Sequence, residues 1–105
     1  LNYLRDKDFK RKMKEKRNAA LRDETLAVQR EINFAYTSTE GYSREFTIPQ
    51  QVSGADWNIS INAQLLYART LDEKYAISFS VPNITGQPKI GQNVIKKING
   101  ETYLN

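Results

Sequence analysis

Residues 3 to about 38 contain neither glycine nor proline, and this run constrains the fold more than any other feature of the chain. Both residue types interrupt helices, so their absence permits one long helix. At ~1.5 Å per residue such a helix would reach about 50 Å, which exceeds the width of a domain formed by a chain this short. The sequence therefore predicts a long N-terminal helix that extends beyond a small body.

The predicted helix changes character halfway along its length. One face carries apolar residues at three- and four-residue steps, namely Leu21, Thr25, Val28, Ile32 and either Ala35 or Tyr36. The same face, followed back towards the N-terminus, carries Lys7, Lys10, Lys14 and Arg17. Because lysine and arginine are rarely buried without partners, only the C-terminal half can pack on a core. We therefore predict a projecting basic helical arm over residues 1–18 and a single α+β head domain over residues 19–105.

After Gly41 the spacing of apolar residues changes to the alternation that is typical of strands. Alternating segments lie at 46–48, 57–61 and 75–81, and a further apolar segment covers 65–68. Near the C-terminus, Asn99-Gly100 separates two more strand segments and is the favoured dipeptide of a two-residue hairpin turn. The sequence thus predicts an α+β fold. In it, a long N-terminal helix packs by its C-terminal half on an antiparallel β-sheet of five or six strands.

The apolar residues of helix and sheet are expected to face each other. Leu21, Val28 and Ile32 of the helix should dock against the sheet residues Trp57, Ile59, Ile77 and Phe79. Since buried apolar surface contributes about 25 cal/mol per Å², this interface should supply most of the stability of the fold.

The composition excludes several kinds of site. The chain contains no histidine and no cysteine, which rules out histidine-based triads, cysteine nucleophiles, disulfides and Cys/His zinc sites. The pairs Asp23-Glu24 and Asp72-Glu73 are expected on a solvated helix face and in a turn, and no calcium-loop spacing joins the second pair to Asp56. We therefore expect no catalytic residue, no cofactor and no metal, and a protein that is not an enzyme.

Positive charge is concentrated in the predicted arm. Residues 1–17 hold eight basic and three acidic side chains, whereas the remainder of the chain is nearly neutral. Such a cluster suits the phosphates of a nucleic acid or an anionic lipid surface. The candidate contacts are Arg5, Lys7, Lys10, Arg11, Lys14 and Arg17. The alternative is a solvated helix that its charges keep soluble.

Two Asn-x-Ser/Thr sequons occur, and they make Asn58 and Asn83 candidate glycosylation sites. Asn58 is expected to point away from Trp57 and Ile59, and Asn83 follows the end of a predicted strand. Both side chains should therefore be exposed, as a glycan would require.

Four short segments carry a resemblance to a known family: GYSREFTIP at 41–49, WNISI at 57–61 with Gly54 before it, PNITG at 82–86, and GQNVIKKINGETYL at 91–104. In these segments the chain resembles archaeal type IV pilin-like proteins that are made with a class III signal peptide. The resemblance covers about residues 25–105 and leaves out the basic arm.

The resemblance implies a non-enzymatic extracellular head domain at the cell surface, anchored in the membrane or in a filament, that acts in assembly or adhesion. An apolar helix upstream of Leu1 would provide the anchor, and copies of the chain or related pilin-like subunits would contact the N-terminal helix. The competing hypothesis, from the residues alone, is a module that binds nucleic acid or another anionic surface through the basic helix. A third alternative is a soluble oligomer held together by that helix.

Overall fold

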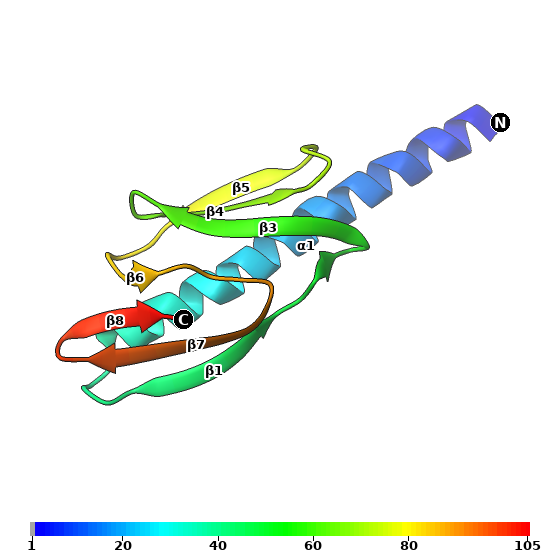
Figure 1. Cartoon of the computed structure of the whole chain (residues 1–105). Coiled ribbons are helices and arrows are strands. Elements are labelled where there is room, and N and C mark those ends of the chain that lie inside the picture. Colours follow the sequence, from blue (N-terminus) through cyan, green and yellow to red (C-terminus); the bar gives the residue numbers. More distant parts are fainter. Residues whose placement is uncertain (1) are drawn as a thin grey trace.

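One long helix and eight strands form the part of the chain described by the computed structural model, which covers the backbone of residues 2–105 and the side chains of residues 7–105 (Figure 1). The order of elements places the helix first and all strands after it. Their bounds are α1 Asn2–Thr37, β1 Ser43–Ile48, β2 Gln51–Val52, β3 Ala55–Asn62, β4 Leu65–Thr70, β5 Ala76–Ser80, β6 Thr85–Gly86, β7 Gly91–Ile98 and β8 Glu101–Leu104. The predicted α+β class with one long N-terminal helix is confirmed.

Helix α1 occupies the run without glycine or proline almost from end to end. It ends where turn residues begin: the Ser38 N–H donates to the Ala35 carbonyl at 3.1 Å, and the Tyr42 N–H donates to the Thr39 carbonyl at 3.2 Å. Gly41 follows with φ 89°, a left-handed conformation that glycine adopts without steric cost. The helix therefore ends at the point that the sequence predicts.

The prediction of one sheet with five or six strands is wrong, because the strands form two sheets of four. The first has the order β1-β7-β8-β6 and the second the order β2-β3-β4-β5. All neighbouring strands are antiparallel except β6 and β8, which are parallel. The two-residue strands β2 and β6 account for part of the difference in number, since alternation cannot be recognised in two residues.

Two prolines stand where the chain crosses between the sheets. Pro49 directly follows β1 and precedes β2, and Pro82 follows β5 on the way to β6. Proline has no N–H to give to a strand ladder, so each strand ends there and the chain leaves its sheet. The first crossing is fixed further by the Trp57 indole N–H, which donates to the Pro49 carbonyl at 2.8 Å.

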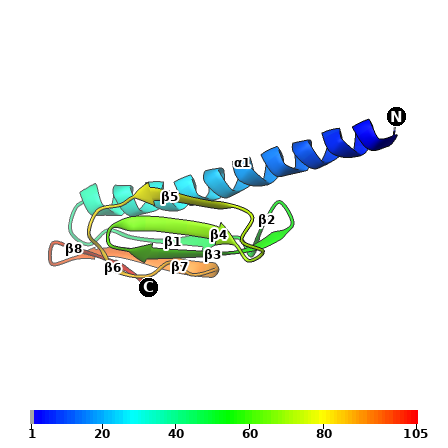
Figure 2. The same cartoon turned by 90° about the horizontal axis from the view of Figure 1, so that it is seen from above.

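The two sheets lie side by side, and α1 covers one face of both (Figures 1 and 2). The helix buries Leu21, Val28, Ile32 and Ala35, in the predicted stripe, whereas Tyr36 is exposed. These residues belong to one core together with Ile48, Val52, Trp57, Ile59, Leu66, Ala68, Tyr75, Val81, Ile95 and Leu104. Of the predicted sheet partners, Trp57 and Ile59 are buried in this core and Ile77 packs against it. Phe79 is only half-buried and lies outside the core cluster.

The N-terminal half of α1 extends beyond both sheets (Figures 1 and 2). This projection gives the molecule its elongated shape, with principal extents of 63 × 23 × 19 Å. The residues of the projecting half whose side chains are described are mostly exposed.

A side chain joins the two sheets where their backbones do not pair. The Gln87 amide, just after β6, donates from Nε2 to the Ile61 carbonyl and accepts the Ile61 N–H at Oε1, both at 2.7 Å. Gln87 therefore gives β3 the donor and the acceptor that a neighbouring strand would give. The adjacent Gly86 lies so close to β8 that an added Cβ would stand 1.9 Å from the Leu104 carbonyl oxygen.

We predict that Gln87→Ala destabilises the fold, because it removes both hydrogen bonds between the sheets. The expected loss is about 1 kcal/mol in the free energy of unfolding, since exposed hydrogen bonds contribute modestly. Chemical denaturation measures it, with Gln50→Ala as control, because Gln50 is exposed in the turn between β1 and β2. Equal stabilities of the two variants would contradict the role given to Gln87.

Gly86→Ala and Gly91→Ala separate a steric clash from backbone strain. The two glycines have similar φ values, 107° and 100°, but an added Cβ at Gly91 meets nothing within 4 Å. We expect Gly91→Ala to cost about 1–3 kcal/mol for the conformation alone. Gly86→Ala should cost about 2 kcal/mol more, because β6 must move away from β8. Equal unfolding midpoints would contradict the close approach of β6 to β8.

Candidate anion-binding groove at the base of the arm

The basic side chains of the arm are mostly solvent-exposed, and they differ in their surroundings. Lys7, Lys10, Lys12, Lys14 and Lys16 are exposed, while Arg17 is half-buried where the helix meets the sheets. Arg11 pairs with Asp8 at 3.4 Å, an exposed ion pair of small energetic value. The side chain of Arg5, another predicted contact, lies outside the described residues.

A groove of about 680 Å³ lies beside the helix where the arm leaves the head, and we call it the basal groove. Its lining combines positive charge with apolar and aromatic surface: Phe9, Lys10, Met13, Lys14, Arg17, Lys74 and Tyr75. The first five come from α1, and the last two come from the β4–β5 turn at residues 71–75. Basic groups from two elements thus line the same space.

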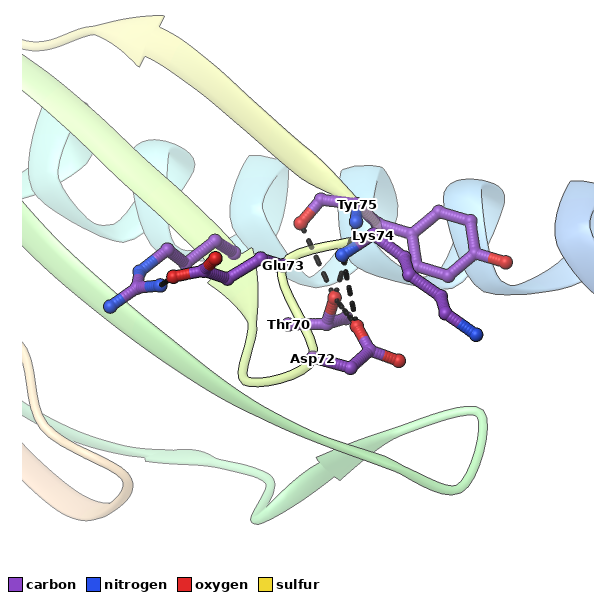
Figure 3. Close-up of polar contacts among 6 residues, drawn as sticks. Thr70, Asp72, Glu73, Lys74 and Tyr75 are labelled. Atoms are coloured by element: carbon purple, nitrogen blue, oxygen red, sulfur yellow. Dashed lines mark hydrogen bonds and ion pairs between the residues drawn. The ribbon is translucent and has the colours of Figure 1, made fainter.

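The β4–β5 turn is held by hydrogen bonds to two side chains, Thr70 and Asp72 (Figure 3). The Thr70 hydroxyl donates to Asp72 Oδ1 at 2.6 Å and accepts the Tyr75 N–H at 3.2 Å. Asp72 Oδ1 also accepts the Lys74 N–H at 3.0 Å. Figure 3 shows the Tyr75 ring in front of the N-terminal part of α1 and the Lys74 side chain next to it, and both residues line the groove. The turn therefore positions both side chains at the groove.

The same hydrogen bonds keep Asp72 ionised. The Thr70 hydroxyl above all, and then the Lys74 N–H, lower the pKa of Asp72, with smaller contributions from the charges of Lys74 and Arg17. Asp72 therefore remains an anion at neutral pH, and its carboxylate accepts hydrogen bonds from two groups of its own turn.

Arg17 is the innermost basic residue of the groove. Its Nε is buried and has no hydrogen-bond acceptor among the residues that the structure describes. A buried donor without an acceptor is costly, and most such donors in proteins are paired. Because Arg17 also lines the groove, its positive charge favours an anion there.

The structure brings together some of the predicted anionic contacts and adds residues that the sequence did not indicate. Lys10, Lys14 and Arg17 meet in the basal groove. Lys7 lies one helical turn further out from Lys10 on the same face of α1. Lys74 and Tyr75 were not predicted, because nothing in the sequence indicates which part of the helix their turn approaches.

Several of the carboxylates whose side chains the structure describes have partners close by in the sequence. Asp56 accepts a hydrogen bond from Gln51 at 3.0 Å, Glu73 pairs with Arg69 at 3.0 Å, and Asp23 is exposed on α1. Across the described part of the chain, no three acidic side chains are placed to hold a metal ion. The acidic groups therefore serve local turns and ion pairs.

Glu40 joins the end of the helix to the β7–β8 hairpin. Its carboxylate accepts the Gly100 N–H at 3.0 Å and the Asn99 N–H. Asn99 and Gly100 have φ values of 54° and 77°, the left-handed pair of the predicted two-residue turn. In this conformation both N–H groups point to one side and suit an anion. The Gly100 N–H, and next the Asn99 N–H, lower the pKa of Glu40.

The two candidate glycosylation residues are exposed. Asn58 lies on β3 between the buried Trp57 and Ile59, so it points to the face of the sheet opposite to the helix. Asn83 lies between β5 and β6.

Comparison of the chain with protein-family models, with curated proteins and with solved structures gave no match. Between residues 2 and 105, no helical segment has the length and apolar character needed to cross a bilayer.

We predict that stability falls in acid through Asp72 and Glu40. Both pKa values are lowered in the folded state, so each carboxylate stabilises the fold above its unfolded pKa of about 4. That contribution is lost as the pH falls through the lowered folded values. In the double variant Asp72→Asn/Glu40→Gln, the melting temperature should therefore fall less steeply below pH ~4 than in the unmodified chain. Parallel curves for the two proteins would contradict this assignment.

Proposed function

We propose that the chain is the non-enzymatic extracellular head of a pilin-like archaeal surface protein, anchored in the membrane or in a filament and acting in assembly or adhesion. Its sheets form the exposed head. The N-terminal part of α1 faces the anchor and contacts copies of the chain or related subunits.

The observation that carries this proposal is that the sheets cover only one half of α1. Its C-terminal half is buried through Leu21, Val28 and Ile32, whereas its N-terminal half extends past both sheets (Figure 2). Exposed helix of this length is rarely stable by propensity alone, and most helical stability in proteins comes from packing. A neighbouring subunit or a membrane anchor would supply the missing contacts.

The outer surface of the head supports an extracellular location. The sheet face opposite to α1 carries Asn58 together with the exposed residues Ser60, Tyr67 and Ser78. A glycan on Asn58 would therefore meet solvent and no core residue. The exposed Asn83 offers a second acceptor.

A second candidate function is the binding of nucleic acid or another anionic surface through the basic helix. The observation that favours it is the basal groove, where Lys10, Lys14 and Arg17 lie with Lys74. This function does not exclude the first, because a surface protein can use its arm at an anionic membrane.

The location can be tested by labelling single cysteines, since the chain has none of its own. We expect Ser78→Cys in the full-length gene product to react with a membrane-impermeant maleimide on intact cells, because Ser78 is exposed on β5. Ala35→Cys is the control: this position is buried under the sheets and should react only after denaturation.

Labelling of Ser78→Cys only after cell lysis would overturn the extracellular assignment. Recovery of the labelled protein from the envelope fraction, or from sheared filaments, distinguishes a membrane anchor from assembly into a fibre. Recovery in the medium as a single chain would contradict both kinds of anchorage.

A further inference from the structure

We propose that the basal groove binds the phosphate headgroup of an anionic membrane lipid. The choice of a lipid as the source of the phosphate rests on the proposed function, in which the arm is the membrane-proximal end of the molecule.

The charge of the groove favours an anion. Lys10, Lys14 and Arg17 from α1 and Lys74 from the β4–β5 turn line it, and no carboxylate is among its lining residues. The nearby Asp72 already accepts the Thr70 hydroxyl and the Lys74 N–H. Asp72 offsets part of the charge of Lys74 and Arg17, whereas Lys10 and Lys14 face no carboxylate within the lining of the groove. Arg17, which is half-buried at the inner end of the groove, adds a guanidinium to this lining.

The apolar lining favours a lipid over a free phosphate ion. The Phe9 side chain is 65% exposed and lies beside Met13 at the outer end of the groove. Neither residue offers anything to an inorganic phosphate, and a groove of about 680 Å³ is far larger than such an ion. A lipid would fill both the basic and the apolar part of the groove, since its phosphate pairs with the lysines and its glycerol and hydrocarbon portion contacts Phe9.

The dimensions of the groove argue against a nucleic acid. From Phe9 to Arg17 the helix rises by only about 12 Å, whereas proteins with substantial duplex affinity engage about 6–10 phosphates. The ring of Tyr75 is 8% exposed, so its face is not free to stack on a base. Phe9 is therefore the one open aromatic ring of the groove, whereas single-strand binders use several.

The experiment measures binding of the full chain to vesicles of phosphatidylcholine in which one lipid in five is phosphatidylglycerol. Vesicles of phosphatidylcholine alone show the contribution of the negative headgroup. Inorganic phosphate serves as competitor, and a single-stranded oligonucleotide serves as the competing macromolecule. Far-UV circular dichroism and thermal unfolding verify that each variant is folded.

Three variants separate the groove from general attraction by the arm. Because each basic residue near an anionic membrane contributes about fivefold to binding, Lys10→Gln/Lys14→Gln should weaken it about 25-fold and Lys74→Gln about fivefold. Arg11→Gln/Lys12→Gln removes the same charge from exposed positions on the side of the helix away from the groove. Since a helix is wider than the Debye length of about 8 Å, this control should lose less than about twofold.

Lys74→Gln is the decisive variant, because Lys74 belongs to the sheet domain and not to the arm. Unchanged binding of Lys74→Gln, or equal losses in the two double variants, would overturn the groove as the site. So would displacement by inorganic phosphate at equal concentration, tighter binding of the oligonucleotide, or no binding to the negative vesicles.

Failure of this inference and failure of the proposed function give different results. If the groove does not bind lipid, Ser78→Cys still reacts on intact cells. If the extracellular assignment is wrong, that label requires lysis, while the isolated chain still binds vesicles through Lys10, Lys14 and Lys74.

Discussion

The contact on which the rest of the structure depends is the buried stripe of α1, formed by Leu21, Val28, Ile32 and Ala35. Each sheet is a single layer with an apolar inner face, and such a layer is stable only when another element covers that face. Here one helix covers both sheets, so Trp57 of the second sheet and Ile95 of the first lose their exposure to water through the same stripe. The dependence is mutual, because the C-terminal half of α1 has no other apolar partner among the described residues.

Much of this arrangement could be predicted from local sequence. The absence of glycine and proline indicated the length of α1, and Asn99-Gly100 indicated the last hairpin. The division into two sheets could not be predicted in the same way, because alternation identifies a strand without identifying its neighbour. Pro49 and Pro82 mark the two crossings, but proline ends a strand equally well before an ordinary loop. Nothing local indicates that Gln87 supplies a strand-like amide to Ile61.

In the candidate site, too, local sequence predicts the residues of one element but not the element that packs beside it. Lys10, Lys14 and Arg17 could be selected from sequence, because a basic cluster is visible in composition and helical spacing places them on one face. Lys74 could not, since its approach to the helix depends on how β4 and β5 lie across α1. Only the turn itself had a local signal: an aspartate at position 72 can accept a backbone N–H two residues later, as it does from Lys74.

The continuity of α1 also has a geometric consequence. No glycine, proline or break in hydrogen bonding separates Arg17 from Leu21. The rotation of the arm about the helix axis is therefore fixed relative to the head. One residue inserted between them would turn the arm by about 100° relative to the sheets and move it by about 1.5 Å along the axis. The side of the arm that carries Lys10 and Lys14 is therefore set by the register of the core. Whatever holds the arm consequently also dictates the direction in which Asn58 and the outer sheet face are presented.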